Sequence, residues 1–334
     1  MADVGLGERI TAYGRYRTKV ARQAVKDSHP VLKLLDEENG VDRVAGGRTY
    51  VNEAITAQNS TVGYVGENGR ASLANQHVLD APESSWTYLL GSITMSLAER
   101  YMNEGQGRYI DVYAAKQDAL EFSMKNIHHA GLLSSGTGTS GLQLDGLAAC
   151  ISTTPTSGTV HTIDRSATNA AWFRNQKFDT ASDWSLGAVD SGNAKKFFDK
   201  LINLTADDGI SSLSCFLAGQ THFEAITDAI GAMQVIQNMN GTGKAGFQKL
   251  NYRNHDIYYG GGINYSGESA LTATRTYGLC LKKGGFNLVY HKKAEFDMLS
   301  PVDASDQAAF SRLMFTMATT TIGAFAKKNI VGFD

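Results

Sequence analysis

Two short motifs carry residue types that could do chemistry. A phosphate-binding loop needs glycine amides and a lysine around the phosphate, and Gly241 to Lys244 supplies half of that pattern. Asn238 stands where the leading glycine is required, and Ala245 replaces the hydroxyl side chain that would hold magnesium. A nucleophile elbow needs a glycine two positions before its serine, but Asn264 occupies that place before Ser266. Neither motif therefore predicts a catalytic site.

The histidines show no spacing typical of a metal site. His128 and His129 are adjacent, and adjacent side chains on a helix point about 100° apart, so the pair cannot easily share one ion. We interpret them as cations near a helix C-terminus, where the helix dipole favours positive charge. The other histidines are scattered, and no carboxylate pair stands out. The sequence thus predicts no catalytic residue, no metal ligand and no cofactor, and we do not expect an enzyme.

The element that must organise the chain is the helical pattern from Arg108 to Leu133. No glycine or proline lies between Arg108 and Ala130, and Gly131 is a natural stop signal. A helix of this length spans roughly 35 Å at about 1.5 Å per residue. We interpret it as a spine, and an ordinary buried helix of an α/β enzyme is the alternative. Side chains at steps of three and four predict its buried stripe: Ile110, Tyr113, Gln117, Leu120, Met124 and Ile127.

Composition narrows the class of protein. The chain has 334 residues, enough for a sizeable core and two domains, and its formal net charge of −2 argues against a polycation that coats nucleic acid. Three cysteines lie far apart in apolar runs, so we expect buried free thiols in place of a disulfide framework or zinc site. We see no signal peptide, and no run approaches the roughly 18 apolar residues of a membrane span. These features predict a soluble cytoplasmic product without a membrane partner.

Residues 1–48 are interpreted as an N-terminal arm. Its charges are segregated, because the stretch from Arg9 to Lys26 holds six basic side chains and no acid, and residues 36–42 are acidic. A short helix is expected over Val31 to Gly40, opened by Pro30. The basic stretch is either a solvated face or a contact for an anionic partner such as scaffold or DNA. The candidate contact residues are Arg9, Arg15, Arg17, Lys19, Arg22 and Lys26.

Residues 49–96 are expected to form a long two-stranded excursion. Thr49 to Ala57 and Ser84 to Ser96 are rich in β-branched and aromatic residues, whereas Gln58 to Glu83 between them shows no hydrophobic period. Such a hairpin is marginal by itself, so we expect another subunit to support it. A disordered surface loop is the alternative. The candidate intersubunit residues surround an Asn-Gly pair that indicates a hairpin tip: Tyr64, Glu67, Asn68, Gly69 and Arg70.

We expect an α+β fold overall, with a mixed α/β region in the second half of the chain, which contains both helical and strand patterns. Helices are expected over Asn193 to Ala206 and Thr221 to Asn238, the first with an apolar face of Phe197, Phe198, Leu201 and Ile202. Strands are expected over Ser212 to Ala218, Phe247 to Tyr252, His255 to Tyr259, Thr276 to Lys282, Phe286 to Tyr290 and Phe310 to Ile322.

One stretch carries a recognisable combination of short patterns. Leu142 to Gln176 contains Asp145-Gly146-Leu147, Thr153 to Val160, Ile163-Asp164-Arg165 and Trp172-Phe173-Arg174-Asn175. Together with the order of elements over nearly the full chain, this stretch resembles the major capsid proteins of tailed bacteriophages, whose fold herpesvirus capsid floors and encapsulins share. The resemblance implies an arm (1–48), an extended loop (49–96), a peripheral domain (97–141 and 298–334) and an axial α/β domain (142–297). The strand Phe310 to Phe325 would rejoin the peripheral sheet beside the spine.

The resemblance also implies function and partners. Such proteins form pentamers and hexamers of an icosahedral shell around packaged double-stranded DNA, with a procapsid stage that matures. The implied partners are other copies of the chain, a scaffolding protein, a portal protein, a cementing or decoration protein, and DNA bound without sequence preference. The implied location is the virion, and the host cytoplasm during assembly. An encapsulin-type nanocompartment shell protein is the alternative, and a soluble hydrolase is a remote one.

One departure from the family concerns covalent cross-linking. Some members join subunits by an isopeptide bond between a lysine of the extended loop and an asparagine. This chain has no lysine from Leu34 to Ala115. The sequence therefore predicts a shell without that cross-link, held by buried interface area and overlapping arms and loops.

Overall fold

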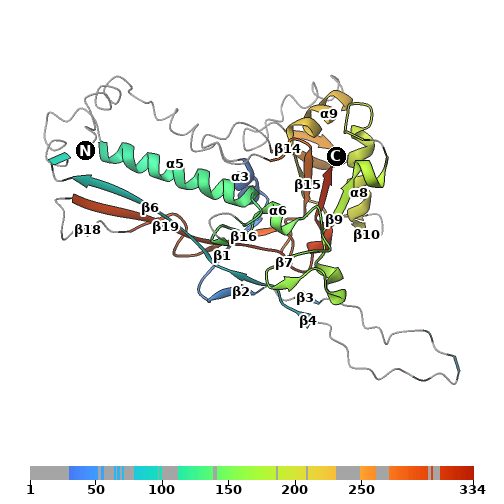
Figure 1. The fold of residues 1–334 in the computed structure, drawn as a ribbon, viewed down its shortest axis with the longest axis horizontal. Helices are drawn as coiled ribbons and strands as arrows, with labels where there is room; N and C mark the ends of the chain where they lie inside the picture. Colours follow the sequence, from blue (N-terminus) through green and yellow to red (C-terminus); the bar gives the residue numbers. More distant parts are fainter. Residues whose placement is uncertain are drawn as a thin grey trace.

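The computed structural model describes most of the chain between residues 30 and 334. The described residues are 30–51, 54–55, 64, 66–67, 70, 79–96, 98–99, 112–137, 141–185, 187–207, 210–230, 249–260, 271–299, 302–303 and 309–334. Both weak catalytic motifs, the basic stretch and the Asn68-Gly69 pair lie outside them. Figure 1 shows an elongated molecule with a long sheet and helix at one end and a compact sheet with helices at the other.

The long sheet is built on two antiparallel strands far apart in sequence, β6 (Thr87–Ser96) and β19 (Ala309–Thr321). The other edge of β19 pairs with β16 (Asn287–His291), β17 (Asp297–Met298) and β18 (Val302–Asp303). β1 (Val41–Val44) extends the sheet by parallel pairing with β16. The prediction that a late strand joins the sheet beside the spine is confirmed, and its residues match the expected range closely.

The spine is confirmed as α5 (Val112–Leu133), which lies along β6 in Figure 1. Close approach is possible because β6 carries Gly91, where a Cβ would lie 2.5 Å from Leu120 Cδ1. The prediction of a single buried stripe is wrong at Ile127, which is 51% exposed. Gly131 does not end the helix, which continues to Leu133. Both differences arise because the last turns leave the sheet and enter the protein core, where His128 to Leu133 are buried on all sides.

The compact sheet has the strand order β13-β14-β12-β15-β20-β9. Its strands are β9 (Gln176–Asp179), β12 (Cys215–Ala218), β13 (Lys249–Tyr252), β14 (His255–Tyr259), β15 (Arg275–Leu279) and β20 (Ile330–Phe333). α8 (Ala194–Thr205) packs on it through the predicted face, whose Phe197, Phe198, Leu201 and Ile202 are all buried. α9 (Gln220–Ile230) packs beside α8, and all four residues of β12 are buried, as predicted.

Three segments pair in sheets across the predicted domain boundaries. Residues 41–44, assigned to the arm, form β1 of the long sheet. Residues 287–291, assigned to the axial domain, form β16 of the same long sheet. Residues 330–333, assigned to the peripheral domain, form β20 in the middle of the compact sheet. The chain therefore crosses between the two sheets more often than a two-segment scheme provides for, and the domain division stays a prediction.

The excursion at residues 49–85, which we call the flap, begins with two short antiparallel ladders. β2 (Thr49–Val51) pairs with β5 (Glu83–Ser85), and β3 (Ala54–Ile55) pairs with β4 (Leu79–Asp80). The expected two-stranded form is confirmed for these residues. Trp86 separates β5 from β6, and its indole Nε1 donates to Gly47 O at 3.1 Å.

The remaining expectations concern the N-terminal helix, the thiols and membrane spans. α3 (Pro30–Glu37) matches the predicted short helix and buries Val31, Leu34 and Leu35 in the main core. The three cysteines are free and buried, as expected. Within the described residues, no helix is both long and apolar enough to cross a bilayer.

Candidate functional site at the base of the flap

A tight hairpin turn holds the flap where it meets the protein body. β7 (Thr159–Val160) and β8 (Ile163–Asp164) are joined by His161 and Thr162, whose φ angles are 48° and 68°. Two consecutive positive φ angles are typical of a type I′ turn. This turn is favoured in two-residue hairpins because its twist matches that of the flanking strands. Residues other than glycine adopt this backbone at some cost in strain. The turn presents His161 O to the flap, where the Glu83 amide donates to it at 3.1 Å.

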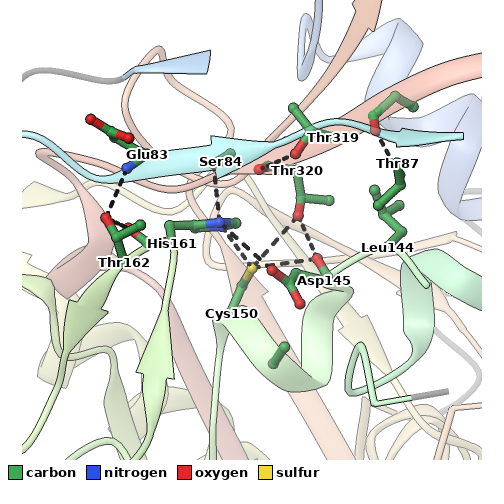
Figure 2. Close-up of polar contacts among 12 residues, drawn as sticks. Glu83, Ser84, Thr87, Leu144, Asp145, Cys150, His161, Thr162, Thr319 and Thr320 are labelled. Atoms are coloured by element: carbon green, nitrogen blue, oxygen red, sulfur yellow. Dashed lines mark hydrogen bonds and ion pairs between the residues drawn. The ribbon is translucent and has the colours of Figure 1, made fainter. Parts of the chain in front are cut away.

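The His161 ring points into a buried polar cluster beneath the flap (Figure 2). Its Nδ1 lies 3.0 Å from Ser84 Oγ of β5, and its Nε2 lies 3.5 Å from Cys150 Sγ. Burial, with a further contribution from the Arg165 charge, lowers the pKa of His161 to about 4. The imidazole is therefore neutral at pH 7. Although Asp145 Oδ2 lies 3.9 Å from Nδ1, the pair is not an ion pair at that pH.

Asp145 and Cys150 connect this cluster to the long sheet and to the short helix α6 (Leu147–Cys150). Thr320 Oγ1 of β19 donates to Asp145 O, and the Cys150 thiol donates to the same carbonyl at 3.6 Å. Burial raises the pKa of the Cys150 thiol to about 12 and also raises the pKa of Asp145. Because the thiolate is the reactive form of cysteine, Cys150 is not a nucleophile here.

The C-terminal end of the spine docks on Gly146. A Cβ at this position would lie 2.5 Å from the carbonyl oxygens of Gly131, Leu132 and Ser134. Only glycine allows these backbone segments to come so close. The contact fixes the end of the spine directly beside the cluster that holds the flap.

Arg165 caps the other end of α6 from inside the protein. It is fully buried, and its guanidinium donates to Ala149 O at 3.1 Å and to Cys150 O. A cation is favoured at this position, because the last carbonyls of a helix lack partners and carry partial negative charge. Asn175 makes a second tie, accepting from the Ser152 amide at 3.0 Å and donating to Ser152 O at 2.9 Å. The sequence patterns that carried the resemblance are therefore structural ties around one junction.

This junction joins four parts of the molecule: the flap base, the β7–β8 turn, the end of the spine and β19. Ser84, Cys150, His161 and Thr320 are buried and hydrogen-bonded, and the Asp145 side chain at the edge of the cluster is 49% exposed. The arrangement can fix the direction of the flap relative to the spine. We call it the flap junction, formed by Ser84, Asp145, Cys150, His161 and Thr320.

The predicted site residues do not meet at the flap junction. Tyr64, Glu67 and Arg70 are exposed on the flap, and Asn68 and Gly69 lie outside the described residues. The six basic residues between positions 9 and 26 also lie outside them. Sequence reasoning missed Ser84, His161 and Thr320. The contacts of Ser84 with His161 and of Thr320 with Asp145 join positions 77 and 175 residues apart, so they leave no local pattern.

One other cluster has the order of a catalytic triad. Thr276 Oγ1 lies 2.8 Å from His222 Nδ1, and His222 Nε2 lies 3.7 Å from Asp334 Oδ1. Thr276 and His222 are fully buried, so no substrate can reach them. Burial also lowers the pKa of His222. Across the described part of the chain, no group of three potential ligands could hold a metal ion.

The adjacent histidines of the spine are buried. His128 and His129 are 6% and 7% exposed, and His128 Nε2 lies 2.9 Å from the Tyr290 hydroxyl. The His128 ring also meets Phe296 edge-on at 5.8 Å. Both rings therefore lie inside the core near the end of the spine, and their interpretation as cations at a helix C-terminus stays a prediction.

The fold matches known shells. A cyanophage A-1(L) capsid subunit superimposes with a TM-score of 0.62 at 16% identity, covering 92% of this chain and 93% of that one. The capsid of a native GTA particle gives 0.56 at 13% identity, covering 90% and 89%. The chain has the tailed-phage major capsid fold. An encapsulin from Synechococcus elongatus PCC 7942, in the holo-SrpI complex, gives 0.53 at 12% identity and covers 100% and 96%. No family model matches the sequence, and no curated protein matches it.

Within this capsid fold, the observed elements take the expected order. The flap follows β1, the spine follows β6, and β19 returns beside the spine before the chain ends in the compact sheet. The flap junction therefore lies where the excursion, the spine and the compact part of the fold meet (Figures 1 and 2).

Proposed function

We propose that the chain is the major capsid protein of an icosahedral shell, assembling into pentamers and hexamers around packaged double-stranded DNA. One observation supports self-assembly above the others. The flap leaves the body on ladders of two and three residue pairs, and its described side chains Val51 and Tyr64 are exposed. A two-stranded ladder is marginal in water, so a neighbouring subunit that covers the flap would supply its missing burial.

Negative-stain electron microscopy of the expressed protein tests this proposal. Closed particles of uniform size are the expected result. A protein that stays monomeric at micromolar concentrations, with and without co-expressed genes from its own locus, would contradict it.

The second test concerns covalent bonds between subunits. Because no lysine lies between Leu34 and Ala115, the flap has no amine for an isopeptide bond. Mature shells boiled in denaturant are expected to run as monomers on gel electrophoresis. A ladder of covalent oligomers would show that another cross-link exists.

The proposed partners follow from the same assignment. A scaffolding protein, a portal protein and a decoration protein would serve assembly, and the basic residues Arg9, Arg15, Arg17, Lys19, Arg22 and Lys26 would contact scaffold or DNA. Replacing the arginines by glutamine is expected to change the salt dependence of assembly. Identical assembly of the variant at every ionic strength would remove this role. The proposed location is the host cytoplasm during assembly and then the virion.

An encapsulin-type shell is the second candidate, since the encapsulin match covers the full chain. The basic stretch at residues 9–26 and the phage-like pattern at 142–176 favour the viral shell. Neighbouring terminase and portal genes would support the viral assignment, and a neighbouring cargo-enzyme gene would support the encapsulin.

A further inference from the structure

A groove opens on the face of the long sheet that also carries the spine. It lies between α3, α5 and the sheet, and its volume is about 630 Å³. Pockets of roughly 300–1,000 Å³ are the size that proteins use to take a ligand or a few inserted side chains. The apolar lining comes from α3, β1, β16, β17, β19 and the loop before β17. Its residues are Leu32, Val41, Leu288, Phe296, Met298 and Met314.

Charged side chains line the same groove. Arg43 makes two hydrogen bonds with the Glu295 carboxylate, at 2.6 and 2.7 Å, and lies 3.5 Å from Asp36. On the spine, Lys125 pairs with Glu121 at 2.9 Å. Three carboxylates against two cations leave the lining with a net negative charge.

The sequence immediately before α3 is complementary to such a groove. Along residues 9–26, two sets of side chains recur with helical spacing on opposite faces. Steps of four and three separate the members of each set, and no acidic residue lies in this stretch. The basic face contains Arg15, Lys19, Arg22 and Lys26, and the apolar face contains Tyr13, Tyr16, Val20 and Ala24.

We propose that this stretch of the same chain binds in the groove as an amphipathic helix, with Tyr16 and Val20 over the apolar floor. Arg17 lies at the border of the apolar face, where it would meet the carboxylates of Asp36 and Glu121. The four residues of the basic face then point outward and stay accessible to an anionic partner. Docking in this way braces α3 against the spine.

Chain connectivity selects the same chain over a neighbouring copy as the occupant. Only residues 27–29 separate Lys26 from Pro30, the first residue of α3. At no more than about 3.6 Å per residue, Lys26 stays within roughly 14 Å of Pro30. Pro30 begins α3, which lines the groove through Leu32 and Asp36. A tether this short gives an effective concentration in the millimolar range, which exceeds what a free copy reaches in solution.

Disulfide trapping tests the proposal on the full chain. The native thiols are buried, so a pair formed by Tyr16→Cys and Met298→Cys reports on the groove with little background. The matched control pairs Thr18→Cys with Met298→Cys, since Thr18 lies on the opposite side of the helix from Tyr16. A disulfide forms only when the two Cα atoms come within about 7 Å, so the two pairs are expected to differ.

The result is read by mass spectrometry of cross-linked peptides after mixing isotope-labelled and unlabelled protein. The expected outcome is a link whose two halves carry the same label, at least tenfold more abundant than in the control pair. Adding Val20→Asp is expected to lower the yield about tenfold, and adding Thr18→Asp is expected to leave it unchanged. A missing link, or one of mixed label that joins two chains, would overturn the proposal. The readout is made within one chain and does not depend on whether shells form.

Discussion

The compact sheet and the flap are both antiparallel in large part, yet they obtain their stability in different ways. Every residue of β12 is buried, and α8 and α9 cover the sheet with side chains such as Leu201 that are fully buried. The flap ladders have two or three residue pairs and leave Val51 44% exposed. Because burial of apolar surface is the main favourable term in folding, the compact sheet can be stable within one chain. The flap depends on whatever holds its base or covers its length.

The flap junction supplies the first of these supports. It fixes β5 through a backbone hydrogen bond from Glu83 and a side-chain contact from Ser84, both to His161. The same cluster is linked to the end of the spine through Gly146, the residue after Asp145. Any change of flap direction therefore requires the spine end or the β7–β8 turn to adjust.

The compact sheet and the flap are expected to differ most in how much stability they lose when one side chain is truncated. Phe216→Ala in β12 removes a ring that is 1% exposed and meets Phe198 edge-on at 5.5 Å. We expect a loss of about 3–5 kcal/mol in the free energy of unfolding, as for other large-to-small core changes. Val51→Ala in the flap is expected to cost under about 0.5 kcal/mol. Urea unfolding of the unassembled protein measures both, and equal losses would contradict the contrast.

The contact between the spine and the junction is expected to be the next most sensitive position. In Gly146→Ala, the new Cβ meets three backbone carbonyl oxygens at 2.5 Å, and backbone cannot move aside as a side chain can. A loss of about 1–3 kcal/mol is expected from this overpacking. Gly66→Ala in the flap is the control, since a Cβ there meets nothing within 4 Å. If both variants unfold at the same urea concentration, the spine end does not dock as described.

Regular elements were predictable from the sequence because their signals are local. The spacing of Phe197, Phe198, Leu201 and Ile202 predicted α8 and its buried face, and the β-branched run of β19 predicted the long strand. The course of the spine was predicted less well. Ile127 fits the three-and-four spacing but is exposed, because the helix leaves the sheet before its last turns.

The flap junction could not be predicted from local patterns. Thr320 and Asp145 are 175 residues apart, and nothing in the sequence around either residue indicates the other. Gly146, Arg165 and Asn175 belong to the patterns that carry the family resemblance, but the sequence alone does not show what these residues do. The structure supplies the reason, because close backbone approach, helix capping and a loop tie are each visible only after the chain has folded.

The flap junction is also expected to make the free energy of unfolding depend on pH. The pKa of His161 is about 4 in the folded protein, below its ordinary value of 6.5. Between these two pH values, His161 is protonated in the unfolded chain and neutral in the folded one. Stability from this group is complete above pH 6.5 and falls as the pH decreases toward 4. The expected loss between pH 7.5 and pH 5 is about 2 kcal/mol.

Comparison with His161→Gln isolates this contribution from other titrating groups. Asp145, Cys150 and Arg165 face His161 and stay in both proteins, as does His222 of the compact region, whose pKa is also lowered by burial. We expect the variant to lose less stability than the wild type over the same pH interval. Parallel curves for the two proteins would show that His161 is already protonated or exposed in solution.

Replacing Tyr64 is expected to have the smallest effect on the stability of the isolated chain. The same replacement tests whether the flap is covered on assembly. Tyr64 is fully exposed on the flap, so Tyr64→Ser removes no buried surface within one subunit and should change the free energy of unfolding by under about 0.5 kcal/mol. If a neighbouring subunit covers the flap, the same change removes an aromatic ring from an interface. Tyrosine is enriched among the minority of interface residues whose truncation costs more than about 1 kcal/mol. The critical concentration for particle formation, measured by light scattering, would then rise at least fivefold. An unchanged critical concentration would show that the flap is exposed in the assembled state as well.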